Sequence, residues 1–135
     1  MGTDMMRLEK QIVMPLLQVA LVGCDHLEQE QAQVILDSLR PFSEQFDEID
    51  LATSTIMRNQ KKDADSIRIL KELIARNPNN WCAKSLLASL YFRMGNKDWR
   101  ELTDEVLQKS SDSNALYLAR LVLKEARGEM LPNEK

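Results

Sequence analysis

The sequence WCAKSLLASLYFRMG, residues 81–95, decides the fold. Counted from its first residue, it has Leu87 and Ala88 at the seventh and eighth positions. Tyr91 follows at the eleventh position and Gly95 at the fifteenth. Apolar residues that recur at three- and four-residue spacing are typical of an amphipathic helix, and a glycine directly after them is typical of its end. We therefore expect one helix that closes in a tight turn.

Similar helix beginnings recur at a constant spacing along the chain, at Val13, Asp47, Trp81 and Ala115. The spacing is about 34 residues, a helical period typical of tetratricopeptide arrays, in which each repeat is a pair of antiparallel helices. β-Branched residues rarely alternate with polar ones, so strands are not expected. The sequence predicts an all-α fold, a tetratricopeptide-like array of about three helical hairpins plus a C-terminal helix.

Small residues support this repeat at its eighth position, where the two helices of a pair approach closely. Ala20, Ser54 and Ala88 stand there in successive repeats. The eleventh position is less regular, because Gly23 and Met57 stand where the third repeat has an aromatic residue. A chance spacing among several helices joined by short turns is the alternative to a true repeat.

The twentieth position, where the second helix of a pair meets the first, holds Ala32 and Ser66 in the first two repeats. In the third repeat it holds Arg100, whose charged side chain cannot pack between helices. Moving the frame by two residues gives this role to Leu102. The second helix of the third repeat is therefore expected to be irregular.

Turn and cap residues set the expected helix boundaries. Pro15 should kink the first helix or start it afresh, and Gly23 should end it. Ser43 is expected to cap the third helix. The expected helices cover residues 4–23, 28–39, 43–59, a fourth from Asp63 to the turn Asn77-Pro78-Asn79-Asn80, 81–94, a sixth through Trp99 and Leu107, and 114–127.

Length and composition indicate one globular domain. The chain has 135 residues, of which 44% are apolar, with only four glycines and four prolines. We expect a polar N-terminal lead at 1–12, a tetratricopeptide-like domain at 13–127 and a flexible C-terminal tail at 128–135. The formal charge of −3 gives no reason to expect binding to nucleic acid or to an anionic membrane. The expected partner is a protein.

The N-terminal region carries no pattern that predicts export or membrane insertion. The apolar run Ile12–Gly23 is broken by Pro15 and Gln18 and is too short to cross a bilayer. Cys24 and Cys82 match no metal-ligand spacing, so we expect two reduced thiols in a cytoplasmic protein. A disulfide between them is the minor alternative.

The consecutive residues Cys24, Asp25 and His26 form the candidate for a nucleophile and its base. Adjacent residues on a turn point apart, and no third group orients the base. With one histidine, no Glu-x-x-His pair and no glycine-rich phosphate loop, neither a metal nor a cofactor is expected. We expect a binding protein rather than an enzyme.

In a tetratricopeptide array the first helix of each pair lines the concave surface, here at positions two, five, nine and twelve. These positions are mostly apolar or small, with Glu48 and Arg58 as charged members, which suits an amphipathic helix of a partner. The alternative is that Met14, Leu17 and Leu21 are buried under the chain's own last helix. The predicted partner-binding residues are Met14, Leu17, Leu21, Cys24, Leu51, Thr55, Cys82, Ser85, Ser89 and Phe92.

Two segments carry a resemblance to a known family. The first is LLQVALVG at residues 16–23, followed by a polar turn with His26 and a Glu/Gln-rich helix start at 28–32. The second runs from Asn80 to Gly95. Over residues 13–126 the chain resembles the tetratricopeptide-like needle chaperones of bacterial type III secretion, the YscG, PscG and EscG group. Its polar lead is longer than that family usually has.

The resemblance implies a bacterial cytoplasmic chaperone that holds the needle subunit before export. The amphipathic C-terminal helix of that subunit would lie in the concave apolar groove and would be kept from polymerising early. A small helical-hairpin co-chaperone would pack against the region Asp4–Leu21. An adaptor or regulatory scaffold that binds an unrelated peptide is the alternative function.

Overall fold

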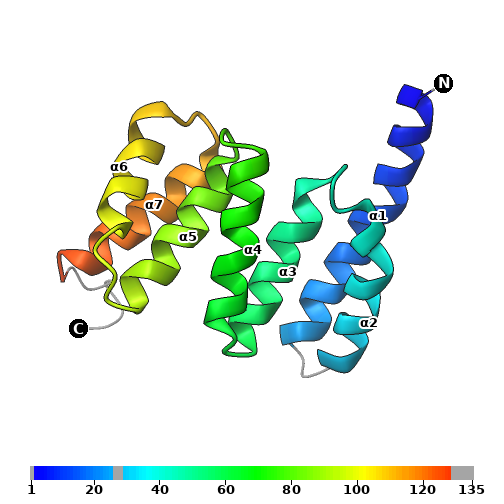
Figure 1. The fold of residues 1–135 in the computed structure, drawn as a ribbon, viewed down its shortest axis with the longest axis horizontal. Helices are drawn as coiled ribbons and strands as arrows, with labels where there is room; N and C mark the ends of the chain where they lie inside the picture. The colour runs from blue at the N-terminus through cyan, green and yellow to red at the C-terminus, as the bar shows by residue number, and fades with distance from the viewer. Residues whose placement is uncertain (1, 26–28, 129–135) are drawn as a thin grey trace. The chain divides into compact units, whose positions relative to one another are not determined.

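The computed structural model describes residues 2–25 and 29–128, and it is all-α there, as predicted (Figure 1). No strand occurs in these two ranges. The helices are α1 Gly2–Asp25, α2 Gln29–Leu39, the short 3-10 helix η1 Arg40–Phe42, α3 Asp47–Asn59, α4 Asp63–Arg76, α5 Trp81–Arg93, α6 Trp99–Lys109 and α7 Ser113–Ala126.

The predicted repeat spacing holds for two helix beginnings. α3 begins at Asp47 and α5 at Trp81, while α7 begins at Ser113, shortly before the predicted Ala115. Val13 is not a helix beginning, because it lies in the middle of α1. The polar residues from Gly2 onward and the apolar residues after Val13 therefore belong to one continuous helix.

Pro15 lies inside α1 without ending it. Proline has no N–H, so it leaves the carbonyl of Gln11 without its usual helical partner. Gln11 and Pro15 are both exposed, so water can solvate that carbonyl. The helix also passes Gly23, its predicted end, and continues to Asp25. Residues 129–135 of the predicted tail lie outside the described part of the chain.

The chain divides into two compact units, Met1–Ile69 (unit 1) and Leu70–Lys135 (unit 2), and the division falls within α4. The domain limits predicted from the sequence, after residues 12 and 127, do not coincide with this division. They stay predictions.

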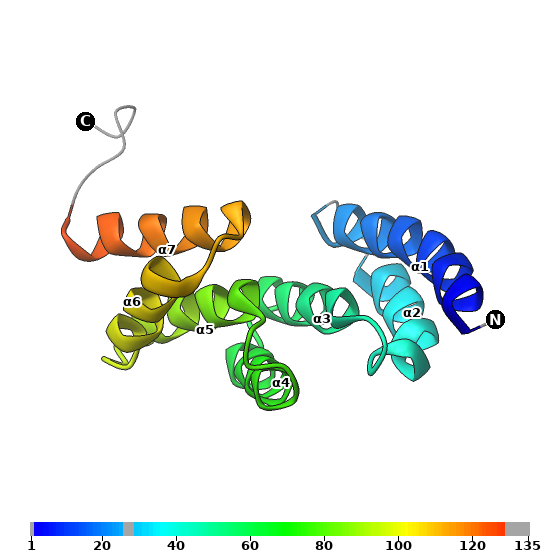
Figure 2. The same ribbon diagram turned by 90° about the horizontal axis from the view of Figure 1, so that it is seen from above.

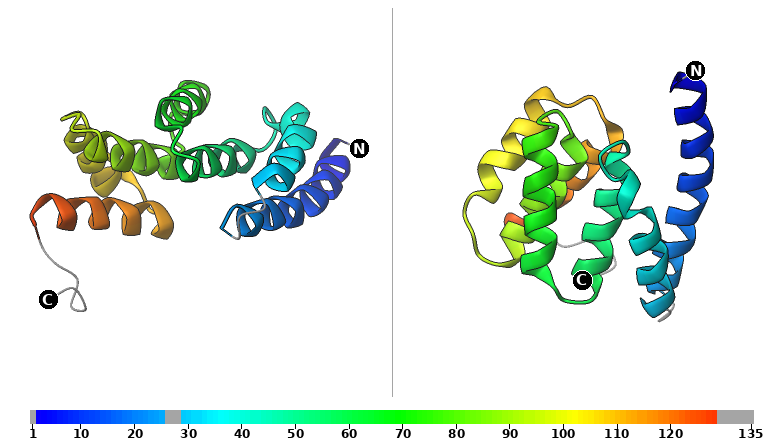
Figure 3. Two further views of the ribbon diagram at one scale, coloured as in Figure 1. Left: turned by 90° about the horizontal axis from the view of Figure 1, so that it is seen from below. Right: turned by 45° about the vertical axis from the view of Figure 1, so that its right-hand side comes forward.

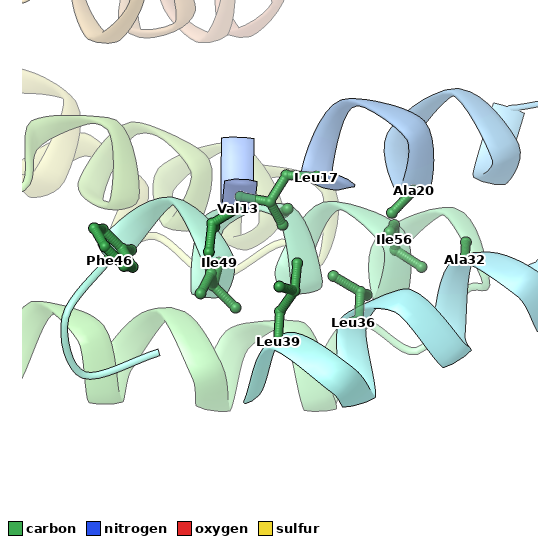
Figure 4. Close-up of a cluster of buried hydrophobic side chains, with 10 residues drawn as sticks. Val13, Leu17, Ala20, Ala32, Leu36, Leu39, Phe46, Ile49 and Ile56 are labelled. Carbon is green, nitrogen blue, oxygen red and sulfur yellow. The ribbon is translucent and has the colours of Figure 1, made fainter. Parts of the chain in front are cut away.

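Unit 1 has an apolar core to which α1, α2 and α3 all contribute (Figure 4). α1 packs against both α2 and α3. The small residues predicted at close approaches are buried, since Ala20 is 0% and Ser54 is 1% exposed. Ser66 Oγ donates a hydrogen bond of 2.8 Å to the Ser54 carbonyl, which joins α4 to α3. The core residues are Val13, Leu17, Ala20, Ala32, Leu36, Leu39, Phe46, Ile49, Ala52 and Ile56.

In unit 2, α5 packs against both α6 and α7 (Figures 2 and 3). This agrees with its sequence, which is apolar on several sides, so that it can bury two faces at once. Ala83, Ala88 and Leu90 on α5 are each at most 2% exposed. α5 is therefore the central helix of unit 2.

The two ends of α5 are set by a short polar residue and a glycine. Asn80 accepts a hydrogen bond of 3.0 Å from the Ala83 N–H and so caps α5. Gly95 follows α5 with a φ of +78°, in the left-handed region that favours glycine. The predicted cap of α3 is wrong, because the N-cap residue of that helix is Phe46, whose side chain makes no capping hydrogen bond. Ser43 lies in the turn before it.

The buried face of α6 stands one position earlier in its repeat than the buried face of α4. The buried residues are Ser66, Leu70 and Leu73 in α4, and Trp99, Thr103 and Val106 in α6. Trp99 thus occupies a place where a small residue was expected. It packs against the small Ala88, and its ring lies 5.3 Å from that of Phe92 in a T-shaped contact. The predicted shift to Leu102 is wrong, since Leu102 is only half-buried.

Thr103 gives a prediction for the stability of unit 2. Its side chain is 0% exposed, and its hydroxyl has no hydrogen-bond partner among the described residues. Valine has nearly the same shape without the hydroxyl, so Thr103→Val should raise the free energy of unfolding by about 1 kcal/mol. Denaturant unfolding followed by tryptophan fluorescence measures this. Both tryptophans, Trp81 and Trp99, lie in unit 2.

The matched control is Thr53→Val in α3. The Thr53 hydroxyl is also buried, but it donates a hydrogen bond of 2.7 Å to the Ile49 carbonyl. Its loss should give no gain in stability, as followed by far-UV circular dichroism. A loss of stability in Thr103→Val would show that the Thr103 hydroxyl is satisfied in solution.

Candidate functional site

A pocket of about 320 Å³ opens between α1 and α3 in unit 1. α1 contributes side chains one helical turn apart, and α3 contributes a matching set. We call it the α1–α3 pocket. Its lining residues are Met14, Leu17 and Gln18 from α1, and Glu48, Leu51, Ala52 and Thr55 from α3.

The structure brings together four of the predicted partner-binding residues in this pocket: Met14, Leu17, Leu51 and Thr55. In the repeat frame they stand at positions two, five and nine, as does Glu48, which the same frame placed on the concave surface. Sequence reasoning missed Gln18 and Ala52. Both stand at position six, directly after position five, so a wider stripe on each helix would have included them.

The α1–α3 pocket has an apolar floor that a partner can reach. Leu17 is buried in the core of unit 1, while Met14, Leu51 and Thr55 are half-buried. Among the described residues of the lining, Glu48 is the ionisable one. Such a surface can bury apolar side chains of a partner, and the described residues of its lining include no histidine, cysteine or lysine that could act as a nucleophile or base.

The sequence left open the alternative that Met14, Leu17 and Leu21 are buried under the last helix of the chain. Leu17 is buried, and it belongs to the cluster that α1, α2 and α3 build in unit 1. Leu21 and Cys24 belong to α1, but their side chains lie outside the part of the chain that is described. Arg58 of α3 is half-buried and does not line the pocket.

The four predicted binding residues on α5 lie apart from this pocket, in unit 2. Ser85 is 0% exposed and donates a hydrogen bond of 2.8 Å to the Ala115 carbonyl of α7. Cys82 packs beside Ala115 and Ala119 of α7. Phe92 contacts Trp99, and Ser89 is half-buried. Because α7 covers this face of α5, a partner could reach Ser85 only if α7 moved.

The comparison with protein families identifies where this architecture belongs. The family of bacterial type III secretion proteins designated HrpB1_HrpK matches residues 3–128. The chain belongs to this family. No curated protein and no solved structure is similar enough to the chain to count as a match.

The described residues form neither a metal site nor a membrane-spanning helix. Within residues 2–25 and 29–128, no group of three or more His, Cys, Asp or Glu residues could hold a metal ion. In those ranges no helix has the length and apolar character to cross a bilayer. The candidate pair Cys24 and His26 lies outside the described side chains. That the protein is not an enzyme stays a prediction.

Cys82 is the thiol that the structure describes. Burial, the larger cause, and the nearby Asp112 carboxylate, the next, raise the pKa of the Cys82 thiol to about 11. The carboxylate acts by repelling the thiolate and by accepting a hydrogen bond from the thiol. Asp112 also caps α7, since it accepts hydrogen bonds from the N–H groups of Asn114 and Ala115. Cys82 is therefore an uncharged thiol at pH 7 and is not an activated nucleophile.

This state of Cys82 is testable by alkylation. In a Cys24→Ser background, Cys82 should react with iodoacetamide at pH 8 at least about tenfold more slowly than in the unfolded chain, because the thiolate is the reactive form. The rate should still rise with pH at pH 10. Adding Asp112→Asn, which keeps the helix cap and removes the charge, should speed the reaction. Equal rates in the folded and unfolded chains would contradict the assignment.

Proposed function

We propose that this type III secretion protein binds an amphipathic helix of a secreted subunit through the α1–α3 pocket. The observation that carries the proposal is the apolar floor of that pocket. It is built by two helices at the positions that a tetratricopeptide array uses for peptide binding. Helices that lie in apolar grooves present residues at i, i+3, i+4 and i+7, and Met14, Leu17, Leu51 and Thr55 offer surface for such a stripe.

The secreted subunit that fits best is the needle subunit. A needle protein polymerises through apolar helix faces, so an exposed face must be covered until export. The α1–α3 pocket would cover part of that face without any chemical step. The protein would thus act as a chaperone, and the cytoplasm is the compartment where such cover is needed before export.

The proposed co-chaperone has a separate surface on α1. Ile12, Leu16 and Val19 are 64%, 38% and 57% exposed, and their spacing places them on one face of the helix. This face differs from the one that Val13, Leu17 and Ala20 bury in the core. A small helical hairpin could cover the exposed face while the pocket stays open.

Leu51→Glu tests the proposal. A carboxylate at the mouth of the α1–α3 pocket would have to be desolvated by an apolar partner helix, so the affinity for the needle subunit should fall at least about thirtyfold, or ~2 kcal/mol. The measurement is co-purification of the needle subunit and the co-chaperone with the tagged protein, all expressed together. Needle subunit should be lost, and co-chaperone should be retained.

The matched control is Gln31→Glu, which adds the same charge to an exposed position of α2, outside the pocket and outside α1. It should leave both partners bound. Retention of the needle subunit by Leu51→Glu, with helical content unchanged, would contradict the proposed site. A wild-type protein that retains an unrelated peptide and no needle subunit would favour the adaptor function instead.

A further inference from the structure

A second pocket, of about 260 Å³, lies in unit 2 between α5 and α6, which pack side by side (Figure 1). We call it the α5–α6 pocket. It shares no residue with the α1–α3 pocket, and the proposed function does not use it. Its lining residues are Leu87 and Tyr91 from α5, Glu101, Leu102 and Glu105 from α6, and Asp98 just before α6.

The floor of the α5–α6 pocket is apolar. Leu87 is 4% exposed, and Tyr91 and Leu102 are half-buried. Tyr91 and Leu102 also pack against the cluster around Trp99, which fixes their positions. A floor of this kind can bury a few methylene groups of a ligand. At about 260 Å³ the pocket is smaller than the usual pockets for drug-sized ligands, so it fits a single side chain better than a cofactor.

The rim of the α5–α6 pocket is acidic along one edge. Asp98, Glu101 and Glu105 are spaced i, i+3 and i+7, which places them on the same side of α6. Glu105 is neutralised by an ion pair with Lys84. Asp98 and Glu101 are exposed, and the described part of the chain gives neither of them an ion-pair partner.

Two cations flank these carboxylates in the sequence, Lys97 before Asp98 and Arg100 before Glu101. The guanidinium of Arg100 lies over the ring of Trp99, 5.2 Å from its centroid. Neither Lys97 nor Arg100 makes an ion pair with Asp98 or Glu101 within the described residues. The mouth of the pocket therefore carries two carboxylates without an ion-pair partner above an apolar floor.

We propose that the α5–α6 pocket docks an arginine or lysine side chain carried by a helix of a partner protein, beside an apolar residue of the same helix. Long cationic side chains bury an aliphatic stem and keep the charged head in water, which matches this floor and rim. Charge complementarity selects the partner, because an anionic segment would be repelled by Asp98 and Glu101. The site is a second docking point, independent of the α1–α3 pocket.

The test uses a synthetic alanine-based helical peptide in which arginine and leucine recur at i and i+4. A second peptide carries glutamate in place of each arginine. Binding of fluorescently labelled peptide to the whole chain is measured by anisotropy at low and at high salt. The arginine peptide should bind, the glutamate peptide should not, and high salt should weaken binding.

The decisive variant is Asp98→Asn with Glu101→Gln. Both side chains are exposed, and the Asp98 side chain makes no capping hydrogen bond, so folding should be unaffected. The dissociation constant for the arginine peptide should rise about fivefold or more. Asp104→Asn removes an exposed charge of the same helix outside the pocket and should leave the constant unchanged.

Leu102→Ala tests the apolar floor and should also weaken binding, with circular dichroism and tryptophan fluorescence to check the fold. The charge variants remain decisive if this variant fails to fold. Absence of binding by the wild-type protein, equal binding of both peptides, or an Asp104→Asn effect as large as that of the double variant would each overturn the proposal.

Discussion

Replacing Ile49 with alanine should lower the free energy of unfolding of unit 1 by about 3 kcal/mol. Ile49 is 1% exposed and lies in the cluster to which α1, α2 and α3 all contribute (Figure 4). The substitution removes three carbon atoms and leaves a cavity among helices that are joined by this cluster. Because α1 packs on α3 through it, the loss should loosen both helices and the α1–α3 pocket between them.

Far-UV circular dichroism during denaturant unfolding measures this loss, since unit 1 contains no tryptophan or tyrosine. Hydrogen exchange of the α3 amides gives a second, local measurement. Val34→Ala is the control, because Val34 is 64% exposed on α2 of the same unit and should change stability by less than about 0.5 kcal/mol. A small effect of Ile49→Ala, equal to that of Val34→Ala, would show that the cluster is loosely packed.

Much of the fold could be predicted because evenly spaced helices leave strong local signals. The beginnings of α3 and α5 were found from spacing alone, and the buried small residues Ala20, Ser54 and Ala88 were found from one rule about close helix approach. These signals are local and periodic, so a single sequence contains them.

The register of α6 could not be predicted in this way. The rule for the twentieth position required a small residue, and Trp99 is one of the largest. It fits because it packs against Ala88 and meets the ring of Phe92, contacts that depend on the tertiary arrangement of α5 and α6. The limits of the long helix α1 were also missed. Pro15 is tolerated because water can solvate the freed carbonyl of Gln11, and Gly23 lowers helix stability without removing a backbone hydrogen bond.

The candidate site shows the same division between local and tertiary information. Positions two, five and nine selected Met14, Leu17, Leu51 and Thr55, which line one pocket between α1 and α3. That these residues bind a partner stays a prediction. The same positions on α5 led to Ser85, which donates its hydroxyl hydrogen to α7. Sequence periodicity identifies the inward stripe of a helix, but it does not say whether a partner or the chain itself covers that stripe.

Glu105→Ala should lower the free energy of unfolding of unit 2 by about 2 kcal/mol. This loss should exceed the loss caused by removing the charge of Lys84, the cation that pairs with Glu105. The Lys84 side chain is only 11% exposed, pairs with Glu105 and lies over the ring of Trp81, 4.8 Å from its centroid. Without the carboxylate, a largely buried ammonium loses its anion, and the cost stays below that of a fully buried pair because Glu105 is 34% exposed.

Lys84→Met is the matched variant, because it removes the charge and keeps the apolar stem over Trp81. Glu105 can then be solvated at its exposed side, so this variant should cost less than about 1 kcal/mol. Tryptophan fluorescence follows both transitions, and the effect of Glu105→Ala should change little with salt, since Lys84 is shielded from solvent. Equal losses in the two variants would mean that Lys84 contributes through its stem alone. The two variants should differ because the two side chains differ in burial. Lys84 is the more deeply buried, so leaving its ammonium without an anion costs more than leaving the Glu105 carboxylate without a cation.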